Sequence, residues 1–371
     1  SIWAYYELGW GGFWFWDPVE NISLMPWLTL TALLHCIIVL ERRTLLTSWV
    51  VILSITTFTL SMCGTFLVRS GILNSVHTFA NDPARGIFIL IFLFVLIILS
   101  LGVFFLFQKE NNKNSNNFFW LSRETSILIN NWFMMYFLSV VLIGTVYPIF
   151  LEVMSSEKIS VGPPFYQKLI APFLILFLFF MSLGPRLKWI KSKIENKNSL
   201  IINLIISTML SFFIIKNLTT HLLFYTVLVS AAFFLFLTTL KELFIKKLKN
   251  VAQTVAHLGF SLLILSILFN NILSSEIITN IRVGEKYNYS KGEIFFKKIE
   301  ENKESNFNSI VAYFEIKDLN GKIVKLKPEI RVYNQPAIIT SEADIKTTLL
   351  DDKFLVMNLV KGNEYFNIRY Q

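Results

Sequence analysis

The sequence predicts an all-α polytopic membrane protein that carries a small β domain at its C-terminal end. Of its 371 residues, 54% are hydrophobic and only 16% are charged, whereas soluble domains carry about a quarter charged residues. The mean hydropathy of +0.56 agrees with a membrane protein. Residues from 274 onward differ, because they mix charged residues with short runs in which apolar residues alternate.

Eight apolar runs are long enough to cross a membrane as helices, which requires about 17–25 mostly apolar residues. These predicted spans are 24–40, 47–67, 87–107, 131–151, 168–184, 199–216, 221–240 and 253–273. The inter-span Lys and Arg residues concentrate in the loops 41–43, 108–123, 186–197 and 241–249. These loops share one side of the membrane if the spans are taken in order, and the positive-inside rule predicts that this side is cytoplasmic. Residues 1–23 and 274–371 are then expected outside.

The net charge of +9 fits basic loops that face anionic lipid. It does not indicate a nucleic-acid-binding protein, because no basic patch lies outside the short loops. The two cysteines, Cys36 and Cys63, lie in apolar runs without CxxC or CxxCH spacing. We therefore expect neither a redox dithiol nor a covalent haem acceptor in this chain.

The C-terminal region has the pattern of paired strands. Residues 310–316 alternate, Asn320-Gly321 is a hairpin turn signal, and residues 322–326 alternate again. Residues 353–360 and 365–370 flank a second turn-like stretch. The sequence opens almost inside a motif and stops in a predicted strand, so we expect a fragment of a longer chain.

The segment from Trp3 to Asn21 is dense in aromatic residues and glycine, and five of the nine Trp residues fall within the first 27 positions. An aromatic belt at the membrane interface would explain the aromatic residues, but it would not explain the glycines. Glycine lets a backbone come close to a flat ligand, and indole rings offer planar faces to a macrocycle. The candidate contact residues are Trp10, Gly11, Gly12, Trp14, Trp16 and Asp17.

Two of the four histidines lie inside predicted spans, where an ionisable residue suggests function. His35 is six residues from Glu41, and His257 is eight residues from Lys249. At 1.5 Å per residue, both lie on the order of 10 Å from the same membrane edge. Equal depth is what two ligands of one metal require, although two unrelated core histidines would also match in depth by chance.

The other two histidines lie in predicted outer loops or at a span end. His77 has Arg69 and Arg85 on either side in one outer loop, and a solvated loop histidine is the alternative to a ligand. Arginine pairs bidentately with carboxylates, so both arginines are candidates for an acidic ligand, although loop arginines often only snorkel. His221 starts a span, and we interpret it as an interfacial residue.

These motifs resemble the WWD domain of the haem-handling proteins CcmC and CcmF. The continuation Asp17-Pro18-Val19-Glu20-Asn21 with Pro26-Trp27 is similar to the CcmF family in particular. Further similar runs are 64–71, 75–77 followed by 82–86, and 256–259. Phe13 departs from the pattern, because the family usually has Trp there. The resemblance is dense up to Gly86, looser from about 110 to 250, and mainly architectural in the β domain.

The resemblance implies two haem sites. One is a haem b held inside the membrane by His35 and His257. The other is a transient haem at the WWD segment, with His77 as one axial ligand of the iron and a second ligand upstream of this fragment. The resemblance also makes Arg69 and Arg85 candidates for the propionates of the transient haem.

The function that the resemblance implies is haem ligation to the CxxCH thiols of apocytochrome c, with the membrane haem keeping the transient haem reduced. The implied partners are apocytochrome c, a CcmE-like haem chaperone, a CcmH-like thiol-handling subunit and membrane lipid. The implied location is the bacterial inner membrane, with the WWD segment and the β domain facing the periplasm, and the mitochondrial inner membrane is the alternative.

A membrane b-type cytochrome-like electron carrier without ligase activity is the rival hypothesis. It would need His35 and His257 but not the aromatic segment or His77. A solute transporter is disfavoured, because it would show broken helices and internal repeats, and the sequence shows neither. No phosphate loop, nucleophile or metal cluster in the sequence suggests another chemistry.

Overall fold

A computed structural model describes residues 5–6, 14–72, 82–107, 119–155, 159–193, 196–245, 251–335, 337–349, 351–360 and 364–371. The chain divides into two compact units. One unit is Trp16–Ile272, and the other joins Ser1–Phe15 to Leu273–Gln371.

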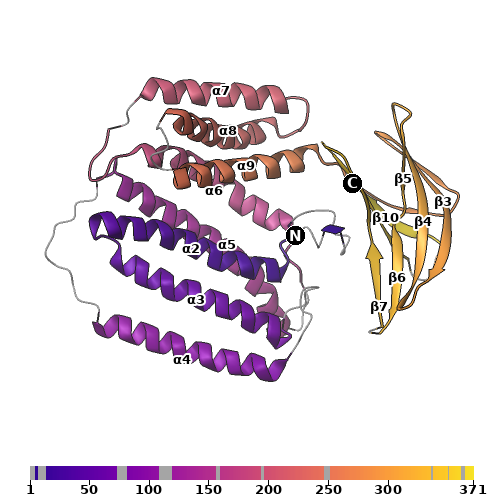
Figure 1. Cartoon of the computed structure of the whole chain (residues 1–371), viewed down its shortest axis with the longest axis horizontal. Coiled ribbons are helices and arrows are strands. Elements are labelled where there is room, and N and C mark those ends of the chain that lie inside the picture. Colours follow the sequence, from indigo (N-terminus) through magenta and orange to yellow (C-terminus); the bar gives the residue numbers. More distant parts are fainter. Residues whose placement is uncertain are drawn as a thin grey trace. The chain divides into compact units, whose positions relative to one another are not determined.

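The unit Trp16–Ile272 is helical (Figure 1). Its helices are α2 (Pro18–Arg43), α3 (Thr47–Ser70), α4 (Pro83–Phe107), α5 (Arg123–Ser155), α6 (Pro163–Leu183), α7 (Lys197–Ile215), α8 (Leu222–Ile245) and α9 (Val251–Leu273), with a short 3₁₀ helix η1 (Gly184–Arg186) after α6. Eight helices of the described residues are long and apolar enough to cross a membrane. The predicted fold class and its eight spans are confirmed.

The helices pack as a layer in which neighbours in space are mostly neighbours in sequence. The order of packed neighbours is α4, α3, α2, α5, α6, α8 and α7. Leu28, Ala32 and Cys36 of α2 are buried against Phe137 of α5 and Phe177 of α6. Helix α9 joins through side chains such as Ile264 and Leu268, which reach the buried cluster of α6 and α8.

Helix boundaries differ from the predicted spans where polar residues extend a helix beyond its apolar run. Helix α5 begins at Arg123, eight residues before the predicted span that starts at 131. The Ser122 hydroxyl accepts from the N–H of Thr125 at 3.2 Å and so caps the helix. Apolar periodicity alone does not detect a helix turn built from polar residues.

The strands of the second unit form two antiparallel sheets. They are β1 (Ile277–Ile281), β2 (Lys286–Tyr289), β3 (Gly292–Lys303), β4 (Phe307–Asp318), β5 (Ile323–Leu326), β6 (Glu329–Asn334), β7 (Ala337–Glu342), β8 (Asp344–Thr347), β9 (Asp352–Leu359) and β10 (Phe366–Tyr370). One sheet has the order β1-β10-β9-β8, and the other has the order β2-β3-β4-β6-β7 with β5 on β4. Inward-facing residues of both sheets, including Phe296, Phe314, Leu355 and Ile368, form one core.

Both predicted strand pairs are confirmed. In the first, β4 pairs with β5, and Gly321 turns the chain with a φ of +77°. Its N–H donates to the carbonyl of Asp318 at 2.8 Å. In the second, β9 pairs with β10. Alternation of apolar residues was sufficient to find these strands, because each has one face against the core.

Candidate functional site

The two membrane histidines belong to helices far apart in sequence, α2 and α9, and both are partly buried. Nδ1 of His35 lies 2.8 Å from the carbonyl oxygen of Thr31, one turn earlier in α2. A ring nitrogen that faces a carbonyl carries the proton, so Nε2 of the neutral ring keeps a free lone pair. This is how ligating histidines are usually held, with the second nitrogen donating to a fixed acceptor.

His257 lies close enough to His35 for the two rings to interact electrostatically. Among the described residues, no hydrogen-bond partner is found for either nitrogen of His257. The two rings therefore lie in one region of the bundle.

The described part of the aromatic segment leads directly into α2. Asp17 caps this helix, because its side chain accepts from the N–H of Val19 at 3.0 Å. The Trp16 ring stacks on Tyr166 of α6, with ring centroids 4.0 Å apart and planes at 5°. One face of this indole is thus covered by another ring. Trp10, Gly11 and Gly12 lie outside the described residues.

Other residues of the aromatic segment contact the β unit. The Tyr5 hydroxyl donates to Asp352 of β9 at 3.3 Å, and its ring centroid lies 5.6 Å from that of Phe354. Burial, together with the Asp352 carboxylate, raises the pKa of Tyr5, so the hydroxyl stays protonated and donates. The guanidinium of Arg369 lies 5.7 Å from the ring centroid of Phe15.

The arginines predicted near His77 lie at the end of α3 and the start of α4, and His77 itself lies outside the described residues. Arg85 pairs with Asp82 at 3.1 Å, with 75% and 37% of the two side chains exposed. Such an exposed pair contributes little to stability, so Arg85 can change partners at small cost. The Asp82 N–H donates to the backbone carbonyl of Arg69 at 2.8 Å, which ties the two helix ends together.

The remaining candidates do not join either site. The backbone N–H of His221 donates to the Thr219 hydroxyl at 3.2 Å in an exposed setting, as expected for an interfacial residue. Cys36 and Cys63 are free. Within the described residues, no group of three or more His, Cys, Asp and Glu side chains could hold a metal ion.

Comparisons with known proteins match both units. The family described as "Cytochrome C assembly protein" matches residues 1–73, and "CcmF C-terminal beta-sandwich" matches residues 272–371. "Cytochrome c-type biogenesis protein CcmF" of Escherichia coli (strain K12) is 34% identical over 378 residues, which cover 100% of this chain and 58% of the relative. The chain belongs to the CcmF family. "Cytochrome c-type biogenesis protein ccl1" of Rhodobacter capsulatus is 34% identical over 375 residues, covering 96% of this chain and 56% of that protein.

A solved structure named "Cytochrome c Heme Lyase CcmF" shares the fold with a TM-score of 0.73 at 22% identity, covering 100% of this chain and 58% of that one. The chain therefore spans a little over half the length of these CcmF proteins. The eight apolar helices and the bacterial relatives make it a multi-pass membrane protein.

One group of buried polar residues near the aromatic segment was missed by sequence reasoning. The side-chain amide of Asn21 is 1% exposed, and its Nδ2 lies 3.0 Å from the Trp16 carbonyl, 3.0 Å from Thr145 Oγ1 and 3.0 Å from the Tyr166 hydroxyl. These contacts fix the start of α2 against α5 and α6. Asn21 stood inside the quoted CcmF motif, but its side-chain partners Thr145 and Tyr166 are more than 120 positions away and carry no periodic signal.

Proposed function

We propose that this chain is part of a haem lyase of cytochrome c maturation, which accepts haem at its aromatic segment and joins it to the thiols of apocytochrome c. The main observation that supports this proposal is that the match to the cytochrome c assembly family, residues 1–73, contains both the aromatic segment and His35. The names of the relatives and of the solved structure supply the activity.

The membrane site supports a haem b between His35 and His257. Haem takes two neutral imidazoles as axial ligands, and the hydrogen bond from His35 to Thr31 leaves Nε2 for the iron. The rings interact electrostatically, and among the described residues the ring nitrogens of His257 have no hydrogen-bond partner. The residues therefore fit this group, which when bound supplies one-electron transfer.

The role of the chain at the membrane site is to hold two neutral rings in a fixed orientation and to exclude water. Thr31 fixes the tautomer and the rotation of the His35 ring. The apolar side chains of α2, α6 and α9, among them Cys36, Phe177 and Phe260, surround the region. Such an apolar shell favours a neutral over a charged imidazole.

At the outer site, haem is the substrate and the reaction is an addition. Each thiol S–H adds across a vinyl C=C bond, so a thioether forms, the hydrogen goes to the neighbouring carbon, and no electrons are gained or lost overall. The chain would supply ring contacts from Trp10, Trp14 and Trp16, close backbone approach at Gly11 and Gly12, and an axial bond from His77. Asp17 acts through α2, because it caps this helix.

Orientation and partners follow from the same proposal. The ends of α2, α4, α6 and α8 that precede the basic loops would face the cytoplasm, and the loop with His77, Arg69 and Arg85 would face the periplasm. Haem delivered by a CcmE-like chaperone and thiols presented by a CcmH-like subunit would then meet on the outer side. Arg69 and Arg85 would pair with the haem propionates there.

A maturation assay with two readouts tests the proposal. In a strain that depends on this protein, His77→Ala should abolish holo-cytochrome c while the membrane haem spectrum stays in place. Trp14→Ala combined with Trp16→Ala should be severe, and Trp14→Phe should be mild, because stacking contributes only about 0.5–1.5 kcal/mol per aromatic pair. Holo-cytochrome c at the parental level in His77→Ala would refute the ligand assignment and favour an electron carrier without ligase activity.

A further inference from the structure

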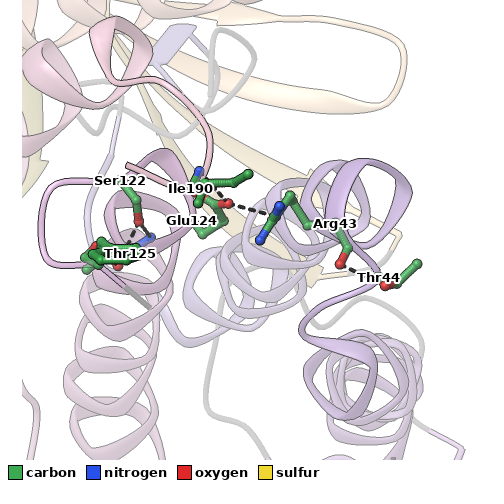
Figure 2. A network of polar contacts seen from close by, with 7 residues as sticks. Arg43, Thr44, Ser122, Glu124, Thr125 and Ile190 are labelled. Carbon is green, nitrogen blue, oxygen red and sulfur yellow. Dashed lines mark hydrogen bonds and ion pairs between the residues drawn. The ribbon is translucent and has the colours of Figure 1, made fainter. Parts of the chain in front are cut away.

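The start of α5 is held in place at the end of the bundle where α2 stops (Figure 2). The Glu124 carboxylate is 2% exposed and lies 3.0 Å from Nε of Arg43. The same carboxylate accepts from the N–H of Ile190, with its two oxygens at 2.9 and 3.1 Å. Ser122 caps the helix just before it. The first turn of α5 is therefore fixed to α2 and to the segment after α6.

This arrangement uses the charge of Glu124, and its neighbour Arg123 interacts with the more distant Glu242 carboxylate only electrostatically. Within the part of the chain that the structure describes, no ion pair to the Arg123 guanidinium is found. The nearby Glu242 pairs instead with Arg186 at 3.2 Å. Arginine carries five N–H donors, and one nitrogen of Arg123, Nη2, donates to Oε1 of Gln253 at 2.9 Å. Guanidinium N–H donors of Arg123 thus remain for another group.

Contacts with two elements direct this guanidinium toward the membrane histidines. Its carbon lies 5.3 Å from the ring centroid of Trp189, which covers one of its faces. Its hydrogen-bond partner Gln253 is four residues before His257 on α9, so the two share one helix face one turn apart. Arg123 also interacts electrostatically with both His257 and His35.

We propose that Arg123 is the residue that binds the acidic edge of the cofactor at the His35/His257 site, a propionate of haem b. The inference rests on the proposed membrane haem. Arginine matches a carboxylate with two parallel N–H bonds, and a half-buried arginine with no carboxylate in hydrogen-bond contact is costly unless such a contact is made. Trp189 and Gln253 act as positioning residues that hold the guanidinium in place.

The test compares haem binding in purified, detergent-solubilised protein with Arg123→Gln, Arg123→Lys and Arg42→Gln. Arg42 is the matched control, because it is exposed at the same end of the bundle and places a positive charge near Arg123 but not near either histidine. The readouts are the bis-histidine optical spectrum, the rate of haem loss to a haem-accepting protein, and the midpoint potential of the haem.

Arg123→Gln should keep the bis-histidine spectrum but lose haem about tenfold faster, the factor that one charge-assisted hydrogen bond supplies. Its midpoint potential should fall, because removing a nearby positive charge stabilises the ferric iron. Arg123→Lys should keep the potential near that of the parent but still lose haem faster, since lysine lacks the planar fork. If Arg123→Gln does not fold, the rate of haem loss from Arg123→Lys still tests the contact. Arg42→Gln should match the parent in all three readouts.

Two outcomes distinguish a failure of the Arg123 assignment from a failure of the proposed membrane haem. If either Arg123 variant loses haem at the parental rate while its spectrum is intact, Arg123 does not bind the cofactor, although the membrane haem stands. If the parent itself has no bis-histidine spectrum, the membrane haem and the role of Arg123 are both wrong.

Discussion

Replacing Asn21 tests whether the start of α2 is fixed by the buried amide. An NH₂ group has two hydrogens, so two of its three neighbours at 3.0 Å are bonded at a time. Each neutral bond contributes about 1 kcal/mol, and an orphaned buried acceptor adds a further cost. Asn21→Ala should therefore destabilise the helical unit by about 2–3 kcal/mol. Asn21→Asp should be at least as severe, because a carboxylate would face the Trp16 carbonyl.

The assay is the apparent Tm of the solubilised protein together with the level of holo-cytochrome c in cells. For a unit of this size, 2–3 kcal/mol corresponds to a decrease of about 4–10 °C. Asn130→Ala is the matched control, because the side-chain nitrogen of Asn130 is buried without a hydrogen-bond partner among the described residues. An apparent Tm for Asn21→Ala within about 1 °C of the parent would refute the reasoning, since no bond of average strength would then have been lost.

Three further predictions concern the bundle. Glu124→Gln should lower the free energy of unfolding by about 2 kcal/mol, because it removes the charge-assisted bonds of a buried carboxylate, and an unchanged denaturation midpoint would contradict this. His35→Ala and His257→Ala should each abolish the membrane haem spectrum, since one imidazole holds haem far more weakly than two; a full b-type spectrum in either variant would exclude the pairing. A cysteine introduced near Asn306 should react with an impermeant reagent added to intact cells, and one near Lys193 should not; labelling at Lys193 would reverse the orientation.

The parts of the fold that sequence reasoning predicted are those with a repeating physical signal. A helix such as α4, whose mean hydropathy is 3.3, can be predicted without tertiary information, because a helix with lipid on most sides is apolar all round. The strands β4 and β5 were visible because one face of each is buried. The first turn of α5 was not predicted, since Arg123 and Glu124 resemble loop residues until their partners on α2 and after α6 are known.

The ligand candidates also carried a signal in the sequence, whereas the residues that would hold them in place did not. His35 and His257 stood out because an ionisable side chain inside an apolar span is rare. Arg123 lies at a span end, where arginine is common and usually snorkels to the surface, so no sequence pattern distinguishes it from an ordinary loop arginine. Its special position depends on Gln253 and Trp189, which are 130 and 66 positions away.

Helix α2 contains His35 and begins at its cap residue Asp17, so candidate residues of both sites depend on this helix, and this constrains how mutants can be interpreted. Asp17 and Asn21 fix its first turn, and the pair between Arg43 and Glu124 fixes its last. His35 lies between these ends, 18 residues after Asp17, or about 27 Å along the axis. A change that tilts α2 at one end would move Asp17 and His35 together. A loss of maturation therefore identifies the outer site only where the membrane haem keeps both its spectrum and its midpoint potential.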